Sequence, residues 1–208
     1  MLLLFALAVA LVAFLAVLMM AIVGTLTFEF QVSLPLIAHS TFHGNAGSYA
    51  FLASSMGLGA ALGGLFFASR KGFTPAKLVS ACLLFGLAVL AADFMPTLAL
   101  SGLALVAVGV CSINFSSLGN SILQLGSAPH MRGRVMSLWS VAFLGSTTIG
   151  GPIVGWVAEE IGARWGLALG GLAALVAAAL GAFAHRNPDP DRAGSRRGGI
   201  ENGIKKWE

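Results

Sequence analysis

Glu29 is the ionisable side chain that lies deep in an apolar stretch of this sequence, since residues 1–38 contain no other charged residue. A carboxylate at mid-membrane depth costs at least a few kcal/mol, so a cavity or a partner should face it and the group should titrate readily. In a continuous helix, Thr25 and Ser33 lie one turn before and one turn after it. This polar line favours a site for proton coupling or for recognition of a cationic or polar substrate.

A second interpretation of Glu29 stays open at this stage. A neutral, protonated carboxyl group could instead form a hydrogen bond to a neighbouring helix without taking part in transport. Gln31 points to another side of the same helix, where an interhelical hydrogen bond accounts for it.

Another polar helical face lies in the second half of a later apolar run, where Asn114, Ser117, Ser121 and Gln124 are spaced 3, 4 and 3 residues apart. Asn114 and Ser117 could line a cavity and contact substrate, whereas Asn120, Ser121 and Gln124 lie nearer its mouth. Helix–helix hydrogen bonding explains the same stripe and is the preferred interpretation.

Other kinds of site find little support in the sequence. No glycine-rich loop followed by Lys-Ser/Thr, no His-Glu-x-x-His and no Gly-x-Ser-x-Gly occurs, so we expect neither an ATPase nor an enzyme and no cofactor. His39 and His43 are four residues apart, but a Gly-Asn turn follows and no carboxylate is near, which favours a solvated loop over a metal site. Cys82 and Cys111 lie in apolar segments, as buried small side chains do.

The composition places these residues in a membrane. Of the 208 residues, 57% are hydrophobic and 10% charged, whereas a soluble domain carries about 25% charged residues. The length allows about six transmembrane helices. The net charge of +4 comes from cations gathered in short loops and the tail, which indicates membrane topology and not nucleic-acid binding.

We therefore predict an all-α membrane protein with a six-helix bundle over residues 17–186. Residues 1–16 form an apolar N-terminal extension, and residues 187–208 form a flexible cytoplasmic tail. The expected spans are residues 17–38, 48–69, 78–92, 97–125, 135–158 and 165–184.

Small residues mark two helix faces for close packing. Gly59 and Gly63 form a Gly-x-x-x-Gly pair in the second expected span. The fifth span carries a stripe of small and polar residues, spaced three, four or seven apart, that lets another helix approach or faces a wet cavity. Its members are Ser137, Ser140, Thr147, Gly151 and Gly155.

Basic turns give the orientation. Loops after the second, fourth and sixth spans hold nearly all the loop cations, while the loops between them hold only Arg164. By the positive-inside rule both termini lie in the cytoplasm of a multi-pass protein of the plasma or inner membrane. The cations on the cytoplasmic side are in Arg70-Lys71-Gly72, Lys77, Arg132-Gly133-Arg134 and Arg186, besides those of the tail. We expect Arg132 and Arg134 to fix topology and to contact lipid headgroups or helix ends, and we prefer this to a direct role in gating.

Three stretches resemble the C-terminal half of a major facilitator superfamily transporter, in particular the drug and siderophore exporters related to the enterobactin exporter. They are Phe28–Gln31 with Leu34–Leu36, then Gly57–Gly64, and Pro129–Ser137, the most specific of them. These are similar to the seventh helix, the eighth helix and the loop between helices ten and eleven.

A weaker likeness concerns the superfamily's Gly-x-x-x-Asp-Arg-x-Gly loop. In Leu65–Gly72 the first glycine is replaced and Ser69 stands in place of the acid, while Arg70 and Gly72 agree. A conformational latch built on that carboxylate is therefore not expected.

The resemblance implies a transporter of twelve helices in two bundles that rock around a central site. This chain corresponds to helices seven to twelve, so the partners implied are the lipid bilayer, a small-molecule substrate, protons, and a missing N-terminal half or a second copy. Proton-coupled export of drugs or siderophores rests on the resemblance alone. The alternative is a truncated bundle that does not transport by itself.

Overall fold

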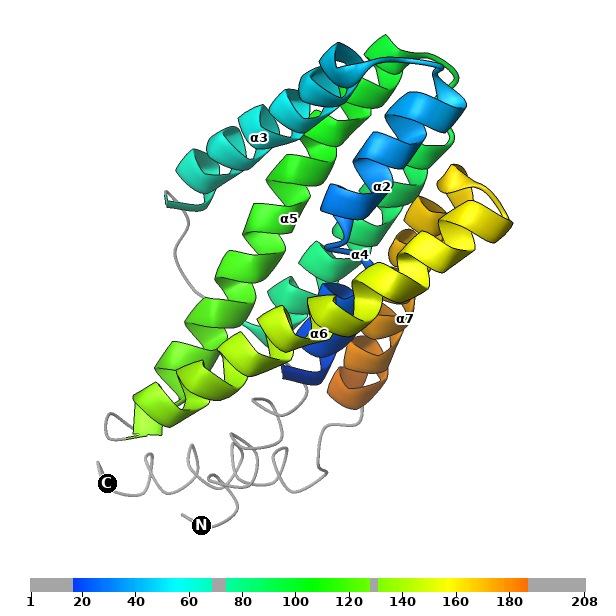
Figure 1. Ribbon diagram of the computed structural model, residues 1–208. Coiled ribbons are helices and arrows are strands. Elements are labelled where there is room, and N and C mark those ends of the chain that lie inside the picture. Colours follow the sequence, from blue (N-terminus) through cyan, green and yellow to red (C-terminus); the bar gives the residue numbers. More distant parts are fainter. Residues whose placement is uncertain (1–16, 69–73, 128–130, 187–208) are drawn as a thin grey trace, which may run out of the picture.

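The computed structural model describes residues 17–68, 74–127 and 131–186, and these ranges contain helices and turns without a strand. The expected extension 1–16, the tail 187–208 and the Arg70-Lys71-Gly72 turn lie outside the described residues. A helical segment at residues 17–26 comes first (Figure 1). The elements that follow are α2 (Phe30–Leu36), η1 (Ile37–Thr41), α3 (Ala46–Ala68), α4 (Pro75–Asp93), α5 (Leu98–Gly126), α6 (Arg132–Glu160) and α7 (Ala163–Arg186).

Five helices of the described part are long and apolar enough to cross a membrane. They are Val17–Thr41, Ala46–Ala68, Pro75–Asp93, Leu98–Leu125 and Ala163–Phe183, close to five of the expected spans. The fifth expected span, residues 135–158, falls within α6, which has 29 residues but is not among these five. Small and polar residues make α6 the least apolar of the long helices, so length and composition do not confirm the predicted count of six spans.

Local sequence explains where several helices begin. Thr74 is extended and Pro75 opens α4, a position where the missing proline N–H is not needed. Thr97 caps α5 because its side-chain oxygen accepts a hydrogen bond from Leu100 N at 3.3 Å. These turns separate the apolar runs, so the chain can reverse direction there.

The first span differs from the continuous helix expected over residues 17–38. Its helix is interrupted at residues 27–29, resumes as α2 and ends in the π-helix η1. At the interruption Phe28 N donates to Val23 O at 3.1 Å, a bond to the fifth preceding residue instead of the fourth. Pro35 lies inside α2, and its missing N–H loosens the ladder just before the π-helical turn.

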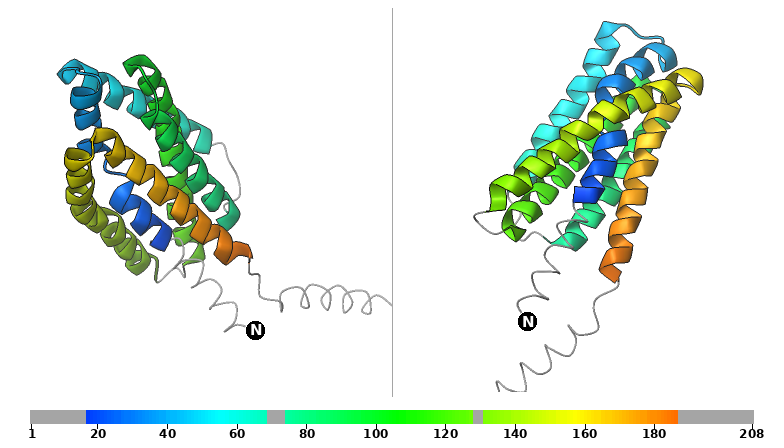
Figure 2. Two further views of the ribbon diagram at one scale, coloured as in Figure 1. Left: turned by 90° about the vertical axis from the view of Figure 1, so that its right-hand side faces the viewer. Right: turned by 60° about the horizontal axis from the view of Figure 1, so that its bottom comes forward.

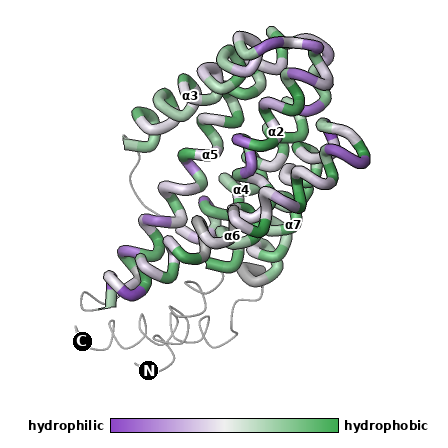
Figure 3. The backbone as a smooth tube through the Cα atoms, viewed as in Figure 1, coloured by the Kyte–Doolittle hydropathy of each residue, from purple (hydrophilic) through white to green (hydrophobic). Residues whose placement is uncertain are grey.

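The helices pack in neighbouring pairs. α3 lies along α5, while α4 packs against both α5 and α7 (Figure 1). α6 packs against α7 and crosses α2, and the segment 17–26 lies between α6 and α7 in the right-hand view of Figure 2. Figure 3 shows that the helices are apolar over most of their length, with hydrophilic residues at the turns and at the start of α2.

An aromatic cluster forms the centre of the core. Phe85 of α4 lies 5.4 Å from Phe28 and 6.3 Å from Phe30, measured between ring centroids, and 6.2 Å from Phe115 of α5. Phe85 and Phe115 are fully buried. The rings of Phe28 and Phe30, on either side of Glu29, are therefore anchored to Phe85 of α4, and Glu29 between them faces elsewhere.

Glycines bring α3 and α5 into close contact. A Cβ atom on Gly59 would overlap the carbonyl oxygen of Val106, and one on Gly63 would lie 2.8 Å from Val110 Cα. On the facing helix, a Cβ on Gly109 would lie 2.7 Å from Ala60 N. Neither backbone leaves room for even a methyl group at these three positions.

Candidate functional site

Glu29 lies at the interruption of the first span, where it is the residue just before α2. Its side chain is buried, with 7% of its surface exposed. Because Phe28 and Phe30 point toward Phe85, the carboxyl group between them points toward α6. At the interruption, the aromatic rings of Phe28 and Phe30 therefore face α4, whereas the carboxyl group of Glu29 faces α6.

Two consecutive glycines of α6 face this acidic group. A Cβ on Gly150 would overlap the carbonyl oxygen of Thr25 and lie 3.1 Å from Glu29 Oε1. A Cβ on Gly151 would lie 3.3 Å from Glu29 Oε2. One turn further, Gly155 faces Val32 at 3.7 Å. The α6 backbone therefore closes directly over the interruption.

α7 closes the interruption from another side. Thr27, which is buried, donates a hydrogen bond from Oγ1 to Gly170 O at 2.7 Å. A Cβ on Gly170 would lie 2.6 Å from the carbonyl oxygen of Leu26. The unwound backbone is thus held between a glycine of α6 and a glycine of α7, a close approach that larger residues would prevent.

The electrostatics of this site are unbalanced. Glu29 Oε1 is buried and makes no hydrogen bond to the described residues. The carbonyl oxygen of Thr25 and Glu29 Oε1 both border Gly150, so two electron-rich oxygens face the same glycine. An isolated carboxylate in such a place is costly, by about 2.5–3.5 kcal/mol at the centre of a membrane helix. The arrangement suits a carboxyl group that holds a proton or an oxygen pair that holds a cation.

The structure places the predicted neighbours of Glu29 in different surroundings, on the two sides of the helix interruption. Thr25 Oγ1 donates to Ala21 O at 2.6 Å, within its own helix. Ser33 is buried in α2, and its backbone N–H donates to Glu29 O at 3.0 Å. Gln31 is exposed. It is the carbonyl of Thr25, and not its hydroxyl, that lies near the acidic group.

Asn114 lies in a different place from Glu29. It lines a cavity between α3, α4 and α5, and its Nδ2 atom donates to Val110 O at 2.6 Å. Ser117 is partly buried, and Gln124 Nε2 donates to Asn120 Oδ1 at 2.6 Å on the exposed part of α5. The structure therefore does not bring the α5 stripe and the acidic group of the first span into one site.

The basic turn before α6 is described only in part. Arg132, Gly133 and Arg134 form the first turn of α6 and are exposed. Ser137 and Ser140, also exposed, donate to the carbonyl oxygens of Arg134 and Met136 in their own helix. The side chain of Thr147, another member of the expected stripe, lies outside the described part.

Sequence reasoning missed three residues of the interruption site and one buried acid. Gly150 adjoins the expected stripe and was detectable there, but nothing marks Thr27 and Gly170, which are 143 residues apart. The buried acid is Asp93, whose Oδ1 atom makes no hydrogen bond to the described residues. Arg164 reaches the same turn and donates to Met95 O at 3.3 Å.

Comparison with known families identifies the kind of protein. A family model described as "transmembrane secretion effector", of the major facilitator superfamily, matches residues 5–196. No curated protein matches the sequence. The match covers most of the 208 residues. Together with the five apolar helices, it shows that this chain belongs to the transmembrane secretion effector family of the major facilitator superfamily, a family of membrane transporters.

Proposed function

We propose that this chain is the C-terminal six-helix half of a proton-coupled exporter of small molecules such as drugs or siderophores. In this proposal α6 is the sixth membrane crossing, both termini lie in the cytoplasm, and the chain carries no enzyme activity. The observation that carries the proposal is Glu29, a buried carboxyl group at a helix interruption in a membrane transporter, whose Oε1 has no hydrogen-bond partner in the described part of the chain.

Helix interruptions suit transport because they place unwound backbone and an acidic group at the same depth in the membrane. Here the interruption lies about ten residues into the first span, well away from its ends. A proton on Glu29 removes the charge and allows α6 to pack closely over it. Loss of that proton restores a charge that favours water or a cationic substrate over the α6 backbone.

The contacts around the interruption suggest which part moves. Phe28 and Phe30 pack against Phe85, and Thr27 is hydrogen-bonded to α7, so these sides resist displacement. On the α6 side, the backbone at Gly150 and Gly151 lies against the acidic group, and Glu29 Oε1 has no hydrogen-bond partner among the described residues. We therefore assign α6 as the element that separates from the first span when Glu29 changes protonation.

The resemblance to one half of a twelve-helix transporter requires a partner bundle for a complete translocation path. That partner is an N-terminal half from another chain or a second copy of this one. Rocking of two bundles around a central site would then expose Glu29 alternately to the two sides of the membrane.

A flux assay with matched variants tests the proposal. The full chain is reconstituted in liposomes loaded with a pH-sensitive dye, and ethidium, a lipophilic cation, is added outside. Where a second copy of the chain supplies the partner bundle in the liposomes, we expect the internal pH to change on addition of ethidium. Glu29→Gln should abolish the change, whereas Glu159→Gln, the same substitution at an exposed residue at the end of α6, should leave it intact.

Two results would count against the proposal. A proton flux in Glu29→Gln equal to that of the wild type would remove Glu29 from the coupling step. A chain that is monomeric in the liposomes and moves neither ethidium nor protons would favour the truncated, non-transporting bundle.

A further inference from the structure

Asp93 and Arg164 are two charged side chains that the proposed transport step does not use, and they lie at the same end of the bundle. Asp93 is the last residue of α4 and is buried, with 7% of its surface exposed. Its Oδ1 atom has no hydrogen-bond partner in the described part of the chain. Arg164 lies in the first turn of α7, is partly buried, and is the only Lys or Arg in the turns after the first, third and fifth expected spans. The positive-inside rule therefore does not explain Arg164, and a local contact should account for it.

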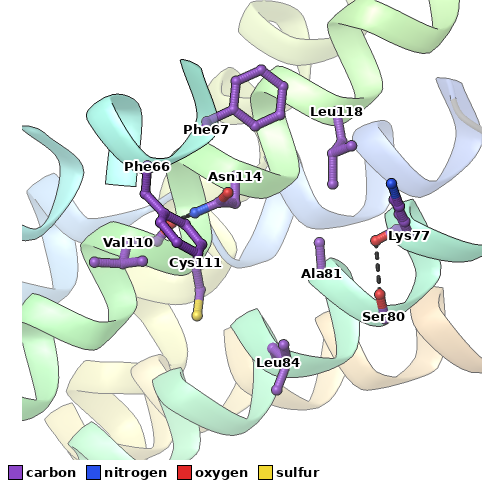
Figure 4. Close-up of a pocket in the computed structure, with 10 residues that line it drawn as sticks. All are labelled: Phe66, Phe67, Lys77, Ser80, Ala81, Leu84, Val110, Cys111, Asn114 and Leu118. Atoms are coloured by element: carbon purple, nitrogen blue, oxygen red, sulfur yellow. Dashed lines mark hydrogen bonds between the residues drawn. The ribbon is translucent and has the colours of Figure 1, made fainter. Parts of the chain in front are cut away.

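The packing of α4 on α7 brings these two residues together. One side of α4 lines the cavity between α3, α4 and α5 (Figure 4), and another side meets α7. On the α7 side, a Cβ on Gly86 would lie 3.0 Å from Gly171 O, and one on Gly171 would lie 3.3 Å from Gly86 O. Seven residues, about two helical turns, lead from Gly86 forward to Asp93 and from Gly171 back to Arg164. Residues seven apart share a helix face, so Asp93 and Arg164 belong to the same contact between α4 and α7.

The contacts of Arg164 agree with this register. Arg164 Nη2 donates to Met95 O at 3.3 Å, two residues after Asp93. Its guanidinium group is also close enough to attract the Asp93 carboxylate electrostatically. Glu159 and Glu160, at the end of α6, are exposed. Arg164 therefore links the turn before α7 to the turn after α4, next to the buried acid.

The helix ends explain why the two charges favour each other. Asp93 places a negative charge at the negative end of the α4 dipole, and Arg164 places a positive charge at the positive end of the α7 dipole. Each charge is therefore unfavourable in its own helix. Across the contact the relation is reversed, because the acid lies beside the start of α7 and the cation beside the end of α4. The pair thereby compensates what each charge costs in its own helix.

The turn next to Arg164 has the features of a hinge. Only Ile161 and Gly162 separate α6 from α7, and Gly162 has a φ of 126°, a conformation that favours glycine. The proposed function requires α6 to separate from the first span, whereas Thr27 holds α7 to that span. A fixed point at the start of α7 would allow α6 to turn about Gly162 and leave α7 in place.

We propose that Asp93 and Arg164 form an electrostatic clamp that holds the first turn of α7 to the end of α4 and fixes one side of a hinge at Gly162. α4 and α7 stay together, and α6 moves relative to them. The clamp itself is independent of proton coupling at Glu29. Only its use in the movement of α6 rests on the proposed function.

A double-mutant cycle tests the clamp without a transport assay. The unfolding temperature of the purified full chain in detergent is measured with a thiol-reactive dye that reports exposure of Cys82, which is buried. Arg164→Gln should lower this temperature by about 4–8 °C, because it leaves Asp93 buried without its cation. In the Asp93→Asn background the same substitution should cost less than half as much, since no buried charge remains there. Glu160→Gln removes an exposed acid four residues before Arg164, and in this control background the cost should be unchanged.

Three results would overturn the clamp. An equal loss from Arg164→Gln in the wild-type and Asp93→Asn backgrounds would show that Arg164 acts through Met95 O alone. A smaller loss in the Glu160→Gln background would make Glu160 the partner of Arg164. If Arg164→Gln does not fold, addition of Asp93→Asn should recover a folded chain, and a double variant that also fails to fold would contradict the clamp.

Hydrogen exchange measured by mass spectrometry tests the hinge. Glu29→Gln imitates the protonated group, so it should slow exchange in α6 and leave exchange in the first two turns of α7 unchanged. When Arg164→Gln is added, the difference should extend into α7. An equal change in α6 and α7 while Arg164 is present would overturn the hinge. No change in α6 would overturn the hinge together with the proposed movement of α6, but not the clamp, which the unfolding temperatures test.

Discussion

The contact between α6 and the interrupted first span predicts a graded response to three glycine substitutions in one helix. A Cβ on Gly150 would overlap a backbone oxygen of Thr25, so one of the two helices must shift. A Cβ on Gly151 would meet Glu29 Oε2 at 3.3 Å, and that flexible side chain can move slightly. A Cβ on Gly145 would lie 4.0 Å from Val141 Cγ1, which is ordinary contact.

The magnitudes follow from two opposing terms. Alanine in place of glycine favours a helix by about 0.8–1.0 kcal/mol, and Gly145→Ala should keep most of this gain. Overpacking costs about 1–3 kcal/mol, and the backbone overlap places Gly150→Ala in that range. The helix gain is common to both variants, so they should differ by the overpacking cost, about 2 kcal/mol at the middle of its range, with Gly151→Ala between them.

Thermal unfolding in detergent measures this series. A thiol-reactive dye reports exposure of Cys82, which is fully buried in the folded chain. A difference of about 2 kcal/mol corresponds to about 4–8 °C for a chain of this size, so Gly150→Ala should unfold that much below Gly145→Ala. Equal unfolding temperatures for the two variants would show that α6 does not pack over the interruption. The close contact between α6 and Glu29 would then be contradicted.

Three further predictions follow from buried contacts of the described residues. Thr27→Val removes a buried hydrogen bond to α7 and should lower stability by about 1 kcal/mol in denaturant titration; an unchanged midpoint would contradict that contact. Gly59→Ala should destabilise the α3–α5 pair by about 1–3 kcal/mol, whereas Gly64→Ala, which meets nothing within 4 Å, should not. A maleimide should label Cys111 in the folded chain and leave Cys82 unlabelled until unfolding, and equal rates would contradict the burial of Cys82.

The sequence predicted the long helices well because their boundaries are local properties. A stretch of apolar residues long enough to cross a bilayer, ended by residues such as Pro75 or capped by Thr97, determines a helix without help from distant residues. α6 was harder to classify, since its small and polar residues suit helix packing and reduce its apolar character at the same time.

The interruption at residues 27–29 could not be predicted from local sequence. The triplet Thr-Phe-Glu contains no helix breaker, and the nearest proline, Pro35, lies six residues further on. The unwound backbone is held instead by tertiary contacts to Gly150 and Gly170, which lie more than a hundred residues away. Spacing rules assume a continuous helix, and the helix is interrupted between Thr25 and Ser33. Spacing alone therefore does not give the positions of these two residues relative to Glu29.

The polar stripe of α5 shows a second limit of spacing arguments. The spacing places Asn114 and Ser117 on one helical face, but it does not say which neighbouring helix that face meets. In the structure Asn114 lines the cavity with α3 and α4, whereas Glu29 faces α6. The arrangement of the helices, which spacing does not give, places the two groups apart.

The central claim is that Glu29 carries the exchangeable proton of this transporter, and infrared difference spectroscopy tests it most directly. The spectrum is recorded for the reconstituted full chain between acidic and alkaline buffer, where the carbonyl stretch of a protonated carboxyl group appears and disappears. All carboxyl groups contribute to this band, so we expect one component of it to be present in the wild type and in Asp93→Asn, which replaces the other buried acid of the described residues, and to be absent in Glu29→Gln. The same band in Glu29→Gln as in the wild type would contradict the claim.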